Sequence, residues 1–173
     1  MQTYHGEQAV QQAIKHYNPE RVSTIARQII HEEGFVTGEY DDHKGVLTAG
    51  VGATGENIGK DFFREVLPKY EKRAATTTKN FTALPQNVQA AVVSMAYRGD
   101  WGPKTRSLLK AGKWAEAAAE YLDHDEYLKG TKEGASNAEK AVSARMERNA
   151  SQLRMMDTIE RTAKQAKTFT NSL

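Results

Sequence analysis

The sequence contains no cysteine among its 173 residues, so disulfide bonds and thiolate chemistry are excluded. Its five histidines have no recognisable metal-ligand spacing. No apolar run is long enough for a transmembrane helix, and the first ten residues lack the basic start and apolar stretch of a signal peptide. A net charge of +2 is too small to indicate a nucleic-acid partner. We therefore expect one globular domain, made in the cytoplasm and not inserted in a membrane.

Residues 18–33 have the pattern of an amphipathic helix. Asn18-Pro19-Glu20 has the order of a helix start, and Gly34 suits a left-handed cap at the other end. The apolar positions fall on one stripe, formed by Val22, Ile25, Ala26, Ile29 and Ile30. Glu33 falls on this stripe in the last turn. Burial and the negative end of the helix would both raise its pKa, and a carboxyl that keeps its proton can act as a general acid. The alternative is a solvent-facing Glu33 that only ends the helix.

The next segment predicts a β-hairpin, with a three-residue turn at His43-Lys44-Gly45. If Asp42 faces Val46 across the turn, Tyr40 faces Thr48. Side chains alternate along strands, so Asp42 and Thr48 then lie diagonally on one face. Gly50 and Gly52 leave that face low, so that another group can approach the backbone closely. The alternative is a polar surface hairpin with an ordinary Asp turn.

The stretch from Glu33 to Gly52 resembles the catalytic segment of the phage-type lysozymes, the muramidases with which tailed bacteriophages open bacterial walls. Their pattern is E-G, then Y-x-D, then G-x-x-T-x-G-x-G, and this chain matches it without a gap. The family usually has His after the last Gly, whereas this chain has Ala53, a departure that bears on stability more than on chemistry. The resemblance implies an α+β, mostly α-helical fold, with a small β-hairpin lobe and a larger helical lobe.

The resemblance also implies a mechanism. Glu33 would donate the proton, and Asp42 and Thr48 would hold the attacking water, so that the β-1,4 bond between N-acetylmuramic acid and N-acetylglucosamine is hydrolysed with inversion. No metal or other cofactor is needed, and a zinc amidase is not expected. Two alternatives stay open: a lytic transglycosylase (or a chitin- or chitosan-cleaving enzyme), and a non-catalytic wall-binding module of a virion or effector. Intact Asp42 and Thr48 argue against the transglycosylase, which needs only the Glu.

Three further residues are candidates for binding the peptidoglycan substrate. They are Tyr40 in the hairpin, and Arg98 and Trp101 after a strongly apolar helix that begins at Gln86. Arg98 would pair with a lactyl or peptide carboxylate, or else form an ion pair with Glu33. Trp101 would stack on a sugar, or else anchor its loop. Arg145 lies in a degenerate copy of a family signature, and could reach back to Glu33.

The whole chain is expected to form one lysozyme-like domain with four parts. These are an extra N-terminal helix (1–17), the catalytic helix and β-hairpin lobe (18–58), a connecting helix (59–80) interrupted at Pro68, and the helical lobe (81–173). We expect a monomer that acts on the periplasmic wall, delivered by a holin, a virion or a secretion machine.

Overall fold

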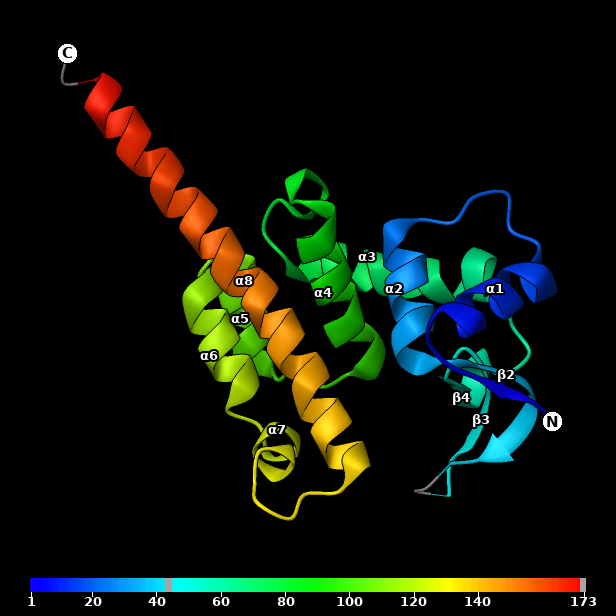
Figure 1. The fold of residues 1–173 in the computed structure, drawn as a ribbon. Helices are drawn as coiled ribbons and strands as arrows, with labels where there is room; N and C mark the ends of the chain where they lie inside the picture. Colours follow the sequence, from blue (N-terminus) through cyan, green and yellow to red (C-terminus); the bar gives the residue numbers. More distant parts are fainter. Residues whose placement is uncertain (43–44, 172–173) are drawn as a thin grey trace. The chain divides into compact units, whose positions relative to one another are not determined.

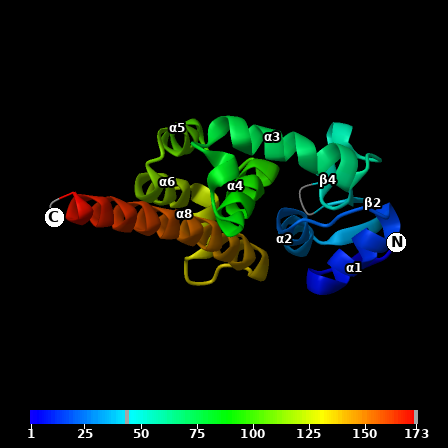
Figure 2. The same cartoon turned by 90° about the horizontal axis from the view of Figure 1, so that it is seen from above.

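A computed structural model of the chain describes residues 1–42 and 45–171. The chain divides into two compact units, residues 1–73 and 74–173. Unit 1 contains a small antiparallel sheet with two helices beside it, and unit 2 consists of helices (Figure 1, Figure 2). This is the mostly α-helical α+β fold of lysozymes that the sequence predicts.

Unit 1 begins with strand β1 (Thr3–Tyr4) and helix α1 (Gly6–Tyr17). Helix α2 follows over Thr24–Glu33. The predicted start of this helix at Asn18 is wrong. Asn18 instead ends α1 in the left-handed conformation, with φ 45° and ψ 58°. The Ser23 side chain accepts from Ala26 N, and so caps α2. Asn tolerates both positions, and only the fold decides which one it takes.

The sheet has the order β1-β2-β3-β4. Its other strands are β2 (Phe35–Asp41), β3 (Leu47–Gly50) and β4 (Ala53–Thr54). Tyr40 pairs with Thr48, as predicted, and the flanking strands β1 and β4 extend the predicted hairpin. Ala53, which stands where the family has His, pairs with Ala49 and is buried. The predicted turn residues His43 and Lys44 lie outside the described residues.

The chain leaves the sheet through the 3₁₀ turn η1 (Gly55–Asn57) and the π-helical segment η2 (Phe62–Val66). Asp61 caps η2 by accepting from Phe63 N and Arg64 N. Helix α3 runs over Leu67–Thr77 and contains the boundary between the two units. The expected interruption at Pro68 therefore takes the form of a change from π to α geometry. The first turn of a helix tolerates a residue without an N–H.

Unit 2 is built around two helices that the sequence predicts. The helix α4 (Gln86–Arg98) is buried from Ala90 to Ala96, and α8 (Asn137–Thr170) begins at a capping box formed by Ser136 and Glu139. Between them come α5 (Pro103–Ala111), α6 (Trp114–Leu122) and α7 (Asp125–Gly130), and a 3₁₀ turn, η3 (Phe81–Ala83), precedes α4. Helix α8 packs on α4, α6 and α7, and its exposed C-terminal half extends past them (Figure 1, Figure 2). Among the described residues, no helix is both long and apolar enough to cross a membrane.

Candidate active site

Glu33 is the last residue of α2, where the helix turns into β2. The stripe on which it was predicted to lie is buried in the structure, at Ile25, Ala26, Ile29 and Ile30. Gly34 ends the helix with φ 79° but ψ −175°, which is extended rather than the left-handed cap that the sequence predicts. This backbone region is open almost only to glycine. The Glu33 side chain is half-buried, and therefore lies neither in open solvent nor sealed in the core.

The Glu33 carboxyl lies directly over Gly52. A Cβ atom added to Gly52 would be 3.0 Å from Glu33 Oε2 and 3.3 Å from Glu33 Cβ, and Gly52 has φ +58°. A side chain at this position would therefore collide with Glu33 and strain the backbone. The close approach that the glycines predict is made here by the proposed acid itself.

The hairpin turn fixes the position of Asp42. Its backbone N–H donates to Val46 O at 2.9 Å, its backbone oxygen accepts from Gly45 N at 2.9 Å, and its Oδ1 accepts from Val46 N at 2.9 Å. Gly45 has φ +72°, as a left-handed turn residue should. An aspartate that bonds to its own turn loses much of its rotamer freedom, so this carboxylate is held in place before substrate arrives.

Thr48 is buried in β3, with 5% of its surface exposed. Its Oγ1 donates to Val46 O at 3.0 Å, so Asp42 and Thr48 both hydrogen-bond to the same residue of the hairpin. This hydrogen bond uses the hydroxyl proton and leaves oxygen lone pairs for a further donor such as water.

Tyr40 stands opposite Thr48 in the sheet. Partial burial raises the pKa of Tyr40, and the charges of Asp42 and Glu33 raise it further. Tyr40, Asp42 and Thr48 thus belong to the hairpin, and Glu33 ends the helix that leads into it.

The other predicted binding residues lie in unit 2. Arg98 is the last residue of α4, and its Nη2 atom is 3.9 Å from Glu126 Oε2, at the limit of an ion pair. Trp101 is only 4% exposed, so its ring offers no face for a sugar, and of its two interpretations the loop anchor fits the structure. A contact of Arg98 or Arg145 with Glu33 stays a prediction.

A buried polar network surrounds Asp100, and it was not predicted from the sequence. Arg145 Nη2 is 2.9 Å from Asp100 Oδ2, and the Tyr121 hydroxyl donates to Asp100 Oδ1 at 3.1 Å. Burial raises the pKa of Asp100, whereas the Arg145 charge and the Tyr121 hydrogen bond act in the opposite direction. The only signal in the sequence was the pair of charged residues, Arg98 and Asp100, directly after a buried helix.

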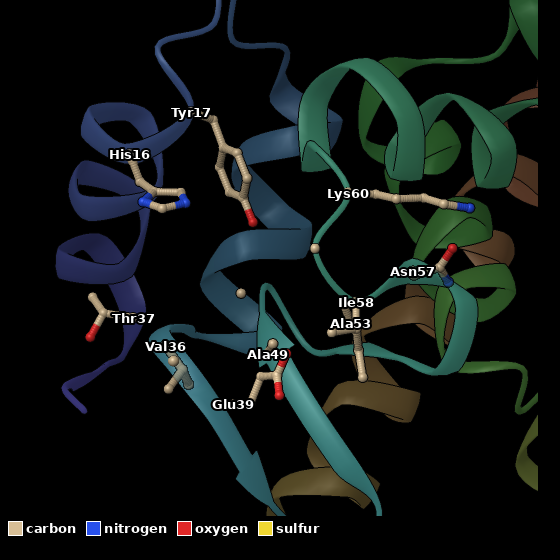
Figure 3. Close-up of a pocket in the computed structure, with 13 residues that line it drawn as sticks. His16, Tyr17, Val36, Thr37, Glu39, Ala49, Ala53, Asn57, Ile58 and Lys60 are labelled. Atoms are coloured by element: carbon tan, nitrogen blue, oxygen red, sulfur yellow. The ribbon is translucent and has the colours of Figure 1, made fainter.

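A pocket of about 210 Å³ lies within unit 1 (Figure 3). Its walls come from the end of α1, the sheet and the loop after η1. They include Tyr17, Glu39, Ala49 and Ile58. The residues that line the pocket do not include Glu33, Tyr40, Asp42 or Thr48. Within residues 1–42 and 45–171, no three His, Cys, Asp or Glu residues are grouped to hold a metal ion.

Comparison with known families decides the assignment. The model of the phage lysozyme family matches residues 30–149, which include all six predicted site residues. The chain belongs to the phage lysozyme family. Membership makes it a peptidoglycan hydrolase of the glycoside hydrolase class. A search of curated proteins finds no match to the chain. Residues 1–29 lie outside the phage lysozyme match.

Proposed function

We propose that the protein is an N-acetylmuramidase that hydrolyses the β-1,4 bond between N-acetylmuramic acid and N-acetylglucosamine with inversion. The observations that carry this proposal are the position of Glu33 at the end of α2, close to Gly52, and the hydrogen bonds that orient Asp42 and Thr48 in the adjoining hairpin. Two carboxyl groups with different surroundings are what acid and base roles on opposite sides of a sugar require.

Glu33 acts as the general acid in this mechanism. Its carboxyl gives a proton to the glycosidic oxygen as the bond to the anomeric carbon breaks. The end of α2 and the approach to Gly52 fix where that carboxyl can stand. Rigid placement of this kind lets a general acid contribute about 10²–10⁴-fold to the rate.

Asp42 and Thr48 act on the water. Asp42 accepts a proton from the water as its oxygen bonds to the anomeric carbon, and the Thr48 oxygen accepts the second water hydrogen bond. The net reaction adds one water: OH to the anomeric carbon and H to the leaving oxygen. Both side chains are already oriented by Val46, so little reorganisation is needed when the water binds.

We further propose that Tyr40 and Arg98 contact the polymer, with the Arg98 guanidinium binding a lactyl or peptide carboxylate. The substrate lies in the periplasm, so delivery by a holin or a virion component fits a role in cell lysis or wall penetration. We propose that the enzyme acts there as a monomer.

The test compares two isosteric variants of adjacent residues, Glu33→Gln and Glu32→Gln. Glu32 is also half-buried and accepts from Gln28 Nε2 at 3.1 Å, but it points elsewhere around the helix. The readout is the clearing of chloroform-treated Gram-negative cells, with mass spectrometry of the released fragments. We expect Glu33→Gln to lose at least about 100-fold in rate. Glu32→Gln should stay close to the wild type.

Each alternative has its own signature. Equal clearing by both variants would contradict the role of Glu33. Wall binding without clearing by the wild type would indicate a non-catalytic module, and anhydro-muramic ends would indicate a transglycosylase.

A further inference from the structure

The N-terminal segment, residues 1–23, lies outside the family match yet contacts the catalytic segment at two glycines. A Cβ atom added to Gly34, directly after Glu33, would be 2.9 Å from Tyr4 O of β1. A Cβ atom added to Gly50 of β3 would be 2.6 Å from the Tyr17 hydroxyl, at the end of α1. The segment therefore lies close to the backbone at two points of the proposed site: at Gly34, directly after Glu33, and at Gly50 in β3.

Tyr17 is held in place by aromatic rings and by hydrogen bonds at the end of α1. Its ring contacts the rings of Phe35, Phe62 and Phe63 with centroids 5.9–6.5 Å apart. The Arg64 guanidinium donates to Tyr17 O and Asn18 O, both at 3.1 Å, which fixes the C-terminus of α1. Figure 3 shows the Tyr17 ring extending from α1 towards the hairpin strands that carry Val36 and Ala49. A ring fixed on these sides moves less easily than a long flexible side chain.

Gly50 lies between the contact with Tyr17 and the proposed catalytic residues. It lies two residues after Thr48 and two residues before Gly52, the residue over which the Glu33 carboxyl lies. It also pairs with Val36 of β2. A shift of β3 at Gly50 would therefore move the Thr48 hydroxyl and the platform under Glu33 together.

We propose that Tyr17 is a positioning residue, and that the N-terminal segment sets the position of β3 for catalysis through the contact of the Tyr17 hydroxyl with Gly50. This inference rests on the proposed roles of Glu33, Asp42 and Thr48. Because it concerns the reacting groups and not the binding of the polymer, it predicts effects on kcat at constant KM. A segment that only stabilises the fold would change the melting temperature alone.

The test is a double-mutant cycle on the full chain, with Gly50→Ala, Tyr17→Phe and both together. Gly50 has φ +57°, so Gly50→Ala introduces both backbone strain and a collision with Tyr17. Gly55→Ala is the matched control, because Gly55 has φ +53° and a Cβ atom there would meet nothing within 4 Å. The readouts are kcat and KM on soluble glycan strands and, separately, the melting temperature.

We expect Gly50→Ala to lower kcat by about 100-fold with KM within about twofold, since misplacement by about 1 Å has this effect on an active site. Adding Tyr17→Phe to Gly50→Ala should raise kcat again by about tenfold, because residues in direct contact are coupled to this extent. Tyr17→Phe alone should lower kcat by a few-fold, and in the Gly55→Ala background it should restore nothing.

Additive effects of Gly50→Ala and Tyr17→Phe on kcat would overturn the proposal, as would a rescue confined to the melting temperature. If the Gly50→Ala variant is insoluble, the test rests on Tyr17→Phe alone. An unchanged kcat of Tyr17→Phe would then overturn the proposal. These outcomes differ from failure of the proposed function, in which the wild type does not hydrolyse the strands or Glu33→Gln remains active.

Discussion

The candidate active site in unit 1 and the buried polar network in unit 2 are held together in different ways. In the site, Asp42 and Val46 are four residues apart, and Thr48 and Val46 are two apart. In the network, Arg145 and Asp100 are separated by 45 residues, and Tyr121 and Asp100 by 21. The side chains of the candidate site are thus held by local turns, whereas those of the network are held by contacts that form only when the chain has folded.

The two regions also treat their charged groups differently. The side chains of Arg145 and Asp100 are only 7% and 4% exposed, and they form an ion pair with each other. Glu33 and Asp42 are half-buried. Glu33 lies close to the backbone of Gly52, and Asp42 lies in the hairpin turn. Charges that satisfy each other in a buried ion pair have a structural role, so Asp100 is not among the carboxylates that we propose to be catalytic.

Asp100→Asn should have the largest effect on stability. It removes the carboxylate that pairs with the buried Arg145, and breaking such a pair costs about 3–5 kcal/mol. Urea unfolding measures the loss. The control is Glu116→Gln, whose pair with Lys113 is 56% and 61% exposed and should contribute no more than about 0.5 kcal/mol. Similar losses from the two variants would contradict the buried network.

Gly52→Ala should affect chemistry more than stability. Its Cβ atom would stand 3.0 Å from Glu33 Oε2, so the carboxyl has to move. We expect kcat to fall by about 100-fold. Gly55→Ala, with a similar positive φ and open space around it, should keep its activity. Equal losses of kcat would mean that backbone strain, and not the contact with Glu33, is responsible.

Thr48→Val should lower kcat by about 10- to 100-fold, because it removes the hydroxyl and keeps the shape of the side chain. Thr48→Ser, which keeps the oxygen, should lose much less. The hydrogen bond to Val46 O is also lost in Thr48→Val, so thermal melting of both variants is needed to separate the two effects. Full activity of Thr48→Val would remove Thr48 from the mechanism.

Ser23→Ala should have a modest effect on stability, a loss of about 1 kcal/mol, since it deletes the cap of α2. Asn18→Gly should be nearly neutral, because Asn18 has φ 45°, a conformation that glycine adopts without strain. Denaturant unfolding measures both losses of stability. If α2 began at Asn18, Asn18→Gly would cost more than Ser23→Ala.

The features that the sequence predicted well are those encoded locally. The apolar stripe of α2, the pairing of Tyr40 with Thr48 and the left-handed Gly45 all follow from short-range patterns. The need for close approach at Gly50 and Gly52 was also predicted, although the groups that approach, Tyr17 and Glu33, were not.

The features that the sequence did not predict depend on distant partners. Asn18 fits a helix start and a helix end equally well, and packing of α1 decides between them. Trp101 is buried and Asp100 is paired with Arg145, and neither fact follows from the neighbouring residues. Strand β1 forms by pairing with the edge of β2, and the paired residues are more than thirty positions apart in the sequence.

The most direct test of the central claim is the anomeric configuration of the new reducing end, followed by proton NMR during the first minutes of digestion of purified glycan strands. Attack by a water held by Asp42 and Thr48, with Glu33 as the acid, predicts that the α-anomer appears first and that the β-anomer grows in by mutarotation. Initial release of the β-anomer, or of strands without a reducing end, would contradict this account.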